Sequence, residues 1–537
     1  MDPTRLQNNL HTESGPAPVQ SEEVASVLIN IKQDLEDYES EIRRLGREME
    51  RLKHYATQLR SLIPPFSKLS DKILQDIFDD CCDMNTFRVN GRPKPMHLSQ
   101  ALKSKPAMVI SSVCSRWRRI ALSMPIIWSR ISLNWGFWED HEYTEDEMET
   151  RFFPLYNFLA RSQQHLLTVH FEIRLFVKGE LHPLLKQIFG QVGRWQCVSF
   201  TCHTGFTLSY IMGRCGIRGA SFPALRELYT RGVVEPEDLT SMIDAAPKLQ
   251  TLNLPNTAIQ LDGLNHPQLS HLDFDPSLCT MEKLFDKCPN LFSLCIGEST
   301  WTGSGVDPMT IACSSKLEIL TVRHGQRYDP PRFPYSVFRF LQLPSLKTLY
   351  LKEEKTWGDI DDPWSHLEHF MVFIQTSAFQ LTTLTIQHLF ISDANLTYIL
   401  VHIPTLQNLT VDDSGITPKC SPISSELIES LHSYRTSSLR QQTAPILPRL
   451  RSLRLLNVAA STFRDLLVVD MIQSRWNPGK LCTEGTSAFE VDCLRAFTMT
   501  FLNRLETEVG DVYSPLGPIE KSGMMIVIQM SGVTLRD

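Results

Sequence analysis

The sequence has no cluster of basic residues, and its formal net charge is −7 over 537 residues. A nucleic-acid-binding domain normally carries a basic patch, so the composition argues against that class of function. No run of roughly 20 apolar residues occurs, and we therefore expect no membrane-spanning helix. The amino-terminal residues also lack the apolar segment of a secretory signal, so we expect no such signal.

Cysteine patterns and catalytic motifs are missing as well. The thirteen cysteines are odd in number and include no Cys-x-x-Cys pair, which favours free thiols in an intracellular compartment, cytoplasmic, nuclear or both. Without ligand pairs at short spacing we expect no zinc site. The motifs of phosphate-binding loops, zinc proteases and serine hydrolases do not occur. The sequence therefore predicts no catalytic residues, no metal and no cofactor, and a protein that is not an enzyme.

The chain does contain a phrase, Leu-x-x-Leu, that occurs nine times between residues 225 and 455. An apolar residue follows two positions later in all but the first copy, and in seven copies a proline stands two residues before the first leucine. The copies begin at Leu225, Leu249, Leu269, Leu291, Leu317, Leu346, Leu381, Leu406 and Leu450. Weaker copies begin at Leu166, Trp195 and Leu494. Most spacings lie in or near the range of leucine-rich repeats.

This pattern predicts an α/β leucine-rich-repeat solenoid over residues 156–537, in which the leucines point inward and stack on those of neighbouring repeats. Helical periodicity fills the segments between phrases. Leu239, Met242 and Ile243 share one helix face, and Ser392–Ile403 repeats the scheme. The asparagine that regular repeats carry three residues after the phrase is missing, so we expect degenerate repeats.

The amino-terminal part has a different pattern. Residues 1–20 are polar and predict a disordered tail, and residues 21–63 predict a coiled-coil helix that ends at Pro64. One seam position is filled by Leu28, Leu35, Ile42, Met49, Ala56 and Ile63, and the other by Val24, Ile31, Tyr38, Leu45, Leu52 and Leu59. Such a stripe needs a partner, which is either a second copy of the chain, giving a homodimer, or the chain's own body.

Between the coiled coil and the repeats, residues 64–135 predict a small all-α module and residues 136–155 an acidic linker. Apolar residues at helical spacing indicate two amphipathic helices. They are Ile73, Leu74, Ile77, Phe78 and Cys81 in the first helix, and Val113, Cys114, Trp117, Ile120 and Ala121 in the second. Trp128 is expected to pack against the first layer of the repeats.

These residues carry a resemblance to a known family. Leu69-x-x-x-Ile73-Leu74-x-x-Ile77-Phe78, then Val113-Cys114-x-x-Trp117-x-x-Ile120-Ala121 and Pro125-x-x-Trp128, resemble an F-box. With a heptad helix before it and degenerate repeats after it, the α+β multi-domain layout is similar to that of F-box-like proteins abundant in mushroom-forming fungi. The resemblance implies the substrate receptor of a cullin-based ubiquitin ligase, whose F-box helices bind the adaptor and whose repeats bind a protein target. The adaptor-binding residues that it implies are Leu69, Ile73, Leu74, Ile77, Phe78, Val113, Cys114, Trp117 and Ile120.

A target-binding surface can be derived from the strand pattern. Side chains alternate faces along a strand, so the residues beside the second leucine of each phrase would line the concave face of the solenoid. The residues selected in this way are Tyr229, Arg231, His271, Asp273, Arg323, Tyr350, Lys352, Asp412 and Arg454. Their mixed charge fits a protein target better than a polyanion.

The front of the F-box-like motif departs from the family pattern. Such families usually read Leu-Pro-x-Glu-(Ile/Val)-Leu, whereas this chain has Leu-Ser-Asp-Lys-Ile-Leu at residues 69–74. Lys72 reverses a charge, and the proline that would begin the helix is missing, although Ser70 or Asp71 can cap it instead. The departure supports an alternative, a coiled-coil and leucine-rich-repeat scaffold without a role in ubiquitin transfer.

Overall fold

A computed structural model of the chain describes residues 18–62, 69–88, 105–135, 145–174, 183–206, 213, 215–216, 219–234, 236–255, 266–274, 281–297, 311–324, 336–353, 364, 366–433, 435–436, 442–443, 445–459, 463–476, 491–502, 504 and 512–531. The predicted tail, except for its last three residues, lies outside this part of the chain. The chain divides into two compact units, Met1–Ile77 and Phe78–Asp537.

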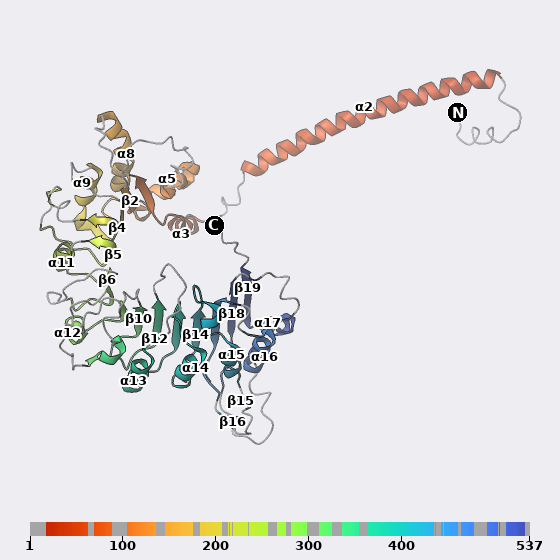
Figure 1. Cartoon of the computed structure of the whole chain (residues 1–537). Coiled ribbons are helices and arrows are strands. Elements are labelled where there is room, and N and C mark those ends of the chain that lie inside the picture. The colour runs from red at the N-terminus through yellow and green to blue at the C-terminus, as the bar shows by residue number, and fades with distance from the viewer. Residues whose placement is uncertain are drawn as a thin grey trace. The chain divides into compact units, whose positions relative to one another are not determined.

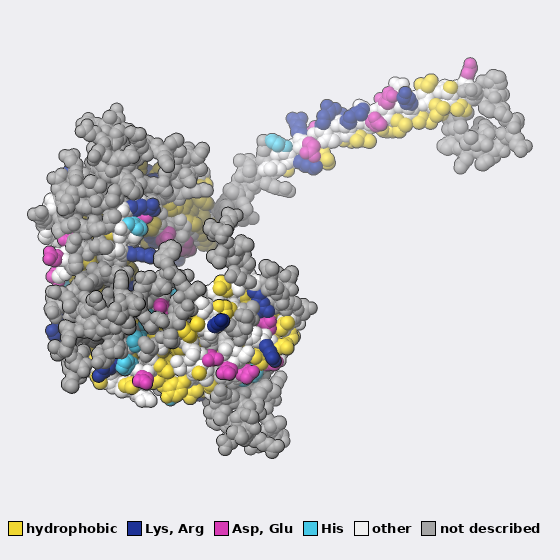
Figure 2. Space-filling model, viewed as in Figure 1, with side chains coloured by type: hydrophobic (Ala, Val, Ile, Leu, Met, Phe, Trp, Pro, Cys, Tyr) yellow, Lys and Arg dark blue, Asp and Glu magenta, His cyan; other side chains and the backbone are white. Residues whose placement is uncertain are grey.

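The first unit contains helix α2, Pro18–Leu62, and most of helix α3, Asp71–Cys81. With 45 residues, α2 is about 68 Å long, and it confirms the helix predicted for residues 21–63. The apolar stripe is exposed from Val24 (37%) to Leu52 (60%), and Figure 2 shows it running along the helix beside charged side chains. Ser70 begins α3, because its Oγ accepts a hydrogen bond from the Ile73 nitrogen at 3.3 Å. Of the two residues that the sequence offers as a cap, Ser70 and Asp71, Ser70 therefore takes this role.

The second unit is built on one 15-stranded sheet whose strand order follows the chain, with every neighbouring pair parallel. Its strands are β1 Asn85–Arg88, β2 Arg130–Trp135, β3 Leu167–Ile173, β4 Trp195–Phe206, β5 Glu227–Val234, β6 Thr251–Leu254, β7 His271–Phe274, β8 Ser293–Gly297, β10 Ile319–His324, β12 Thr348–Glu353, β13 Thr383–Gln387, β14 Asn408–Asp412, β17 Ser452–Val458, β18 Ala496–Leu502 and β19 Met525–Ser531. The fold is thus α+β with a large parallel sheet and an amino-terminal helix.

The repeated phrase sets the register of this sheet. In all nine copies the strand begins two residues after the first leucine, and both leucines are at most 2% exposed. The second leucines face one another across the strands, as Leu320 does with Leu294 and Leu349. They form a continuous apolar layer that no single strand could bury by itself. In the first copy Thr230 takes the apolar position, and its buried hydroxyl has no hydrogen-bond partner.

Helices follow many of the strands, and Figure 1 shows α11, α12, α13 and α14 along one side of the sheet. The α-helices described after residue 140 are α8 Glu145–Arg161, α9 Pro183–Phe189, α11 Pro236–Asp244, α12 Met281–Lys287, α13 Leu367–Ser377, α14 Asp393–Val401, α15 Ser425–Ser430, α16 Asp465–Trp476 and α17 Gly517–Lys521. Two short strand pairs, β9 Ala312–Cys313 with β11 Leu341–Gln342 and β15 Arg435–Thr436 with β16 Gln442–Thr443, lie outside the main sheet. Among the described residues, no helix combines the length and apolarity needed to cross a membrane.

The helices predicted between the phrases are confirmed. Leu239, Met242 and Ile243 of α11 are at most 1% exposed. Ser392 caps α14, since its Oγ accepts a hydrogen bond from the Asn395 nitrogen at 3.2 Å. Leu396 and Ile399 of α14 are also fully buried, so both helices pack apolar residues into the core.

The sheet begins earlier than the sequence indicates. β1 and β2 lie within residues 64–135, which were expected to be all-α, and α8 occupies part of the segment expected to be an acidic linker. In β2, apolar and polar residues alternate, and Ile131 and Leu133 are at most 1% exposed. β2 pairs with β3, which places Ile131 opposite Val169. The helical module and the sheet are therefore continuous through these strands.

Gly232 in β5 provides a test of this packing. Its φ is +98°, and a Cβ atom there would lie 1.7 Å from the carbonyl oxygen of Cys202 on β4. Gly232→Ala is therefore expected to lower the free energy of unfolding by about 2 to 3 kcal/mol. Gly193→Ala is the control, because nothing lies within 4 Å of its Cβ position. Equal stability of both variants in urea unfolding would contradict the close approach.

Candidate binding surfaces

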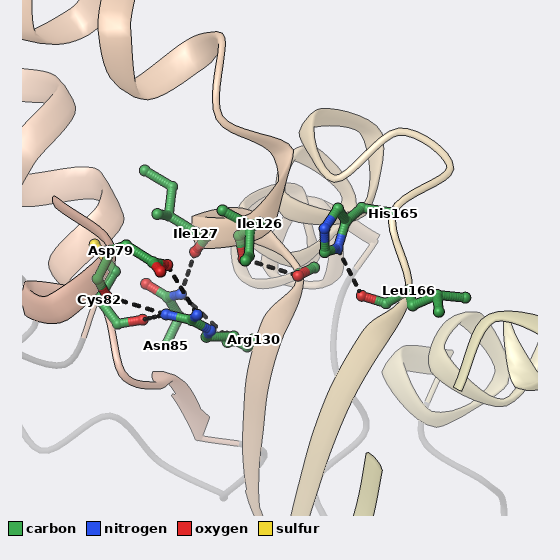
Figure 3. A network of polar contacts seen from close by, with 9 residues as sticks. Asp79, Cys82, Asn85, Ile126, Ile127, Arg130, His165 and Leu166 are labelled. Atoms are coloured by element: carbon green, nitrogen blue, oxygen red, sulfur yellow. Dashed lines mark hydrogen bonds and ion pairs between the residues drawn. The ribbon is translucent and has the colours of Figure 1, made fainter. Parts of the chain in front are cut away.

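Three short helices follow β1, namely α5 Pro106–Val113, α6 Ser115–Leu122 and α7 Pro125–Trp128. Asn85 connects them to the sheet (Figure 3). Its Nδ2 donates to the carbonyls of Ile127 at 2.8 Å and Arg130 at 3.0 Å, and its Oδ1 accepts from the Ala107 nitrogen at 3.2 Å. Because Asn85 is fully buried, this one side chain fixes the beginning of α5 and the end of α7 on the first strands.

A second anchor is Arg130, at the beginning of β2. Its guanidinium forms an ion pair with Asp79 at 2.8 Å and donates to the carbonyls of Asp79 and Cys82, both at 3.0 Å. Figure 3 shows these contacts converging on the arginine. A cation at the carboxyl end of a helix is favourable, so Arg130 holds the last turn of α3.

Trp128 completes the attachment of the module. It is fully buried, and its Nε1 donates to the Ala121 carbonyl at 2.8 Å. Its ring meets that of Phe158 on α8 at 4.8 Å, with the Arg161 guanidinium 4.5 Å above it. Trp128 thus packs between α6 and α8, the helix that leads into β3.

The second helix of the module differs from the sequence prediction. Val113 and Trp117 were expected on one helix, but Cys114 has extended dihedral angles, with φ −158° and ψ 171°, and separates α5 from α6. Its Sγ accepts a hydrogen bond from the Trp117 nitrogen at 3.5 Å and caps α6. Cysteine is not a usual capping residue, so propensity gave no sign of the break.

The nine residues that the resemblance assigned to adaptor binding fall into buried and exposed groups. Leu74, Phe78 and Ile120 are at most 3% exposed and belong to the core. Leu69 and Trp117 are half-buried, and Cys114 is exposed. Ile73, Ile77 and Val113 are 47%, 37% and 56% exposed. Only the partly or fully exposed residues of this set can meet a partner without unfolding the module.

One further surface residue on α5 was missed by the sequence reasoning. Val109 is 38% exposed and lies one helical turn before Val113, so the two valines share a face. The α5 segment contains few polar residues, and its helical period alone could not tell which apolar side chains face the core. The Val109–Val113 pair is nevertheless a candidate contact surface.

The second candidate surface is the face of the sheet opposite the leucine layer. Register places the predicted target-binding residues in three parallel rows on this one face. The middle row contains Ser199, Tyr229, Asn253, Asp273, Cys295, Thr321, Tyr350, Thr385, Thr410 and Arg454. Arg231, Arg323, Lys352 and Asp412 lie two residues further along their strands, and His271 two residues earlier. All nine predicted residues therefore share a face.

The side chains on this face differ in their exposure and in whether they already form hydrogen bonds or ion pairs. Asp273 accepts a hydrogen bond from Asn253 at 2.9 Å and forms an ion pair with Arg323 at 2.7 Å, with side chains 19% and 10% exposed. The Tyr229 hydroxyl donates to Glu227 at 3.1 Å, and burial together with that carboxylate raises the pKa of Tyr229 to about 12. Tyr350, Lys352 and Arg454 are exposed. The exposed group is the part of the face most accessible to a target.

A polar ladder that the sequence analysis did not identify closes the turns after β13, β14 and β17. His388, Asp413 and Asn457 each stand seven residues after the first leucine of their phrase, one position before the slot where an asparagine was sought. His388 and Asn457 adopt positive φ values of 55°. His388 Nδ1 meets the Ser414 carbonyl at 2.5 Å, and Asn457 Nδ2 donates to Asp412 at 2.9 Å. His388 thus provides a partner for a turn carbonyl, whereas Asn457 bonds to a side chain at the end of the neighbouring strand.

Asp412 and Asp413 are neighbours in this ladder, and their carboxyl pKa values are shifted in opposite directions. Burial opposes the ionisation of Asp412, but hydrogen bonds from Ser414 and Asn457 outweigh it and lower the pKa of that carboxyl. For Asp413, burial raises the pKa to about 7, although Ser421 donates a hydrogen bond to its Oδ2 and works in the opposite direction. The charge of Asp412 adds to the increase.

A pH dependence of stability follows from Asp413. Because its folded pKa of about 7 exceeds the usual 3.8, the folded chain binds this proton more tightly. The contribution of protonated Asp413 to the free energy of unfolding is therefore fully present below about pH 4. This contribution, on the order of 2 to 4 kcal/mol, is lost as the pH rises through 7. Asp413→Asn should remove this part of the dependence and be the more stable form at pH 8 in urea unfolding. Asp412→Asn should instead destabilise the protein at neutral pH, and a flat wild-type profile would contradict the assignment.

A hollow of about 570 Å³ lies at the other edge of the sheet, where β10 to β17 begin. Its charged lining residues already form pairs: Glu318 with Lys347 at 2.8 Å, and Asp492 with Arg449 and Arg451 at 3.0 and 2.8 Å. Among the described side chains, no three His, Cys, Asp or Glu groups are placed to hold a metal ion together. This hollow therefore offers no convergent set of unpaired titratable groups.

Comparison with known proteins adds no assignment: no protein-family model and no curated protein matches this sequence.

Proposed function

We propose that the protein is the substrate-recognition subunit of a cullin-based ubiquitin ligase, in which α3, α5 and α6 bind the adaptor and the sheet face opposite the leucine layer binds a protein target. The observation that carries the proposal is the exposure of branched apolar side chains on the module. Ile73 and Ile77 on α3, and Val109 and Val113 on α5, are between 37% and 56% exposed. Exposed apolar groups on short helices favour a protein-binding role.

The energetics of the module support this role. Full burial of a valine or isoleucine side chain contributes about 1.5 to 3 kcal/mol relative to exposure. A helical module that leaves such side chains exposed forgoes this stabilisation when it is alone, and it regains the energy when a partner covers them. The module's buried apolar residues, with the Asn85 and Arg130 anchors, provide the rigid support that such a surface needs.

We also propose that the sheet and its helices form a degenerate leucine-rich-repeat solenoid, with the sheet face opposite the leucine layer as its concave surface. All-parallel sheets are usually covered on both faces, and the exposed polar residues Tyr350, Lys352 and Arg454 on this face suit a binding partner. Tyr350 and Arg454 in the middle row belong to the residue types that dominate interface energetics. The receptor would perform no bond chemistry, and would raise the effective concentration of its target near the ubiquitin-loaded enzyme.

The proposal is tested by co-expressing the full chain with the cullin-ligase adaptor. A receptor is expected to co-purify with the adaptor through size-exclusion chromatography and to recruit the cullin through it. A folded chain that captures no adaptor would overturn the proposal. The departure at Ser70–Lys72 would then favour a coiled-coil and repeat scaffold without a ligase role.

A further inference from the structure

Helix α2 presents an apolar stripe that is exposed over its whole described length. Nine seam side chains between Val24 and Leu52 are between 37% and 68% exposed. In steps of three and four they define heptads with Leu28 at position a and Ile31 at position d. More than four heptads exceed the minimum that indicates a coiled coil. The partner and its direction can be argued from the charges that flank the seam.

Two rows of residues flank this seam. Between residues 25 and 60, position g carries Val27, Asp34, Glu41, Glu48 and Tyr55, and position e carries Ala25, Lys32, Glu39, Gly46, Lys53 and Arg60. The charged residues of the g row are therefore all acidic, whereas those of the e row are mixed and include two lysines and one arginine. In a coiled coil these positions meet the partner helix and determine which orientation is compatible.

In a parallel, in-register pair of identical helices, each g residue meets the e residue five positions further along the partner. Glu48 then faces Lys53, which is attractive, and Asp34 faces Glu39, which is repulsive. Glu41 faces Gly46 and makes no charge pair. By symmetry each contact occurs twice, so attraction and repulsion are balanced.

In an antiparallel pair whose seams overlap from position 24 to position 63, g faces g and e faces e. Matching position 28 with position 59 places Glu41 opposite Glu48 and Lys32 opposite Lys53. Both contacts are repulsive, both occur twice, and no pair of opposite charges forms among these flanking residues. The charges therefore disfavour the antiparallel arrangement.

We propose that α2 forms a parallel, two-stranded coiled coil with a second copy of this chain. The occupant of the stripe is thus the same helix, with identical seam residues side by side. A dimer formed in this way carries two copies of the second unit on one stalk, so two target surfaces act together and raise avidity. The proposal does not depend on the ligase role.

The test is the mass and self-affinity of the full chain, measured by sedimentation equilibrium. The wild type is expected at twice its 61.4 kDa mass. Glu48→Lys replaces both attractive pairs of the parallel dimer by repulsive ones, and should weaken it roughly tenfold. The same variant would strengthen an antiparallel dimer, because the introduced ammonium group would face Glu41. Glu36→Lys, an equal charge change at outward position b, should leave the affinity unchanged.

A covalent measurement determines the orientation independently. In the parallel dimer the two copies of Ile31→Cys lie side by side. In the antiparallel arrangement residue 31 lies opposite residue 56, so the two copies of residue 31 are roughly 37 Å apart. Mild oxidation should therefore cross-link Ile31→Cys, and not the outward Gln33→Cys. A dimer strengthened by Glu48→Lys would overturn the parallel orientation. A wild type that is monomeric at all concentrations would overturn the proposal that a second copy is the partner. In that case Ile42→Asp would lower the Tm if the stripe packs against the chain's own body.

Discussion

Arg475→Leu is expected to lower the free energy of unfolding of the second unit by about 3 to 5 kcal/mol. Arg475, on α16, is fully buried. Its guanidinium donates hydrogen bonds to the carbonyls of Leu431, Ile446 and Leu447, the last at 3.0 Å. Burial lowers the pKa of Arg475 to about 10, which still leaves the side chain charged at neutral pH.

The expected loss of stability is large because leucine cannot replace the hydrogen bonds that Arg475 donates. The variant removes a buried cation, but it also leaves three buried carbonyl groups without a donor, and each such loss costs about 1 to 3 kcal/mol. Arg475→Lys should be intermediate, because an ammonium group cannot reach three carbonyls with the geometry of a guanidinium. Arg464→Leu, at an exposed position, should change stability by less than about 0.5 kcal/mol. If urea unfolding showed that Arg475→Leu lowers the free energy of unfolding by less than about 1 kcal/mol, the three carbonyls would have to accept hydrogen bonds from other donors in the variant.

Much of the sheet could be predicted from the sequence, because one pattern repeats. Leu249 and Leu252 are typical: the two leucines agree with those of eight other copies, the preceding proline agrees with that of six of them, and the strand begins where the phrase requires it. Side-chain alternation then places residues such as Tyr350 and Arg454 on one face. The local sequence pattern is sufficient to predict these strands because the leucines of every repeat pack in the same way.

The remaining features depend on contacts that sequence spacing does not encode. β1 has only four residues, and Asn85 is buried through bonds to residues more than twenty positions away. The break at Cys114 and the burial of Leu74 and Phe78 reflect tertiary packing, since an amphipathic pattern does not distinguish a core face from a partner face. Arg475 carried no signal at all, because an isolated arginine in a helix is usually exposed.

Val113→Asp is expected to weaken adaptor binding by at least about 100-fold, because the new carboxylate would lose its hydration in the contact without gaining a partner. Val113 is 56% exposed in the last turn of α5, so the substitution removes little core packing. Folding should therefore be preserved. The expected loss belongs to the interface and not to stability.

The matched control is Ser112→Asp, one residue earlier in the same helix turn. Ser112 is exposed and donates a hydrogen bond to the Met108 carbonyl at 2.7 Å, so both variants place a carboxylate near the same helix end. Ser112 lies about 100° around the helix from Val113, so its variant should bind the adaptor more tightly than Val113→Asp does if Val113 itself makes the contact. Similar losses in both variants would indicate an electrostatic effect on the helix, not a direct contact at Val113.

The central claim is that this chain is an adaptor-binding receptor, and calorimetric titration of purified adaptor into the full chain tests it most directly. We expect one adaptor per chain with a Kd below about 1 µM, retained by Ser112→Asp and lost in a folded Val113→Asp variant. A folded wild-type chain that gives no binding heat at adaptor concentrations of about 100 µM would contradict it.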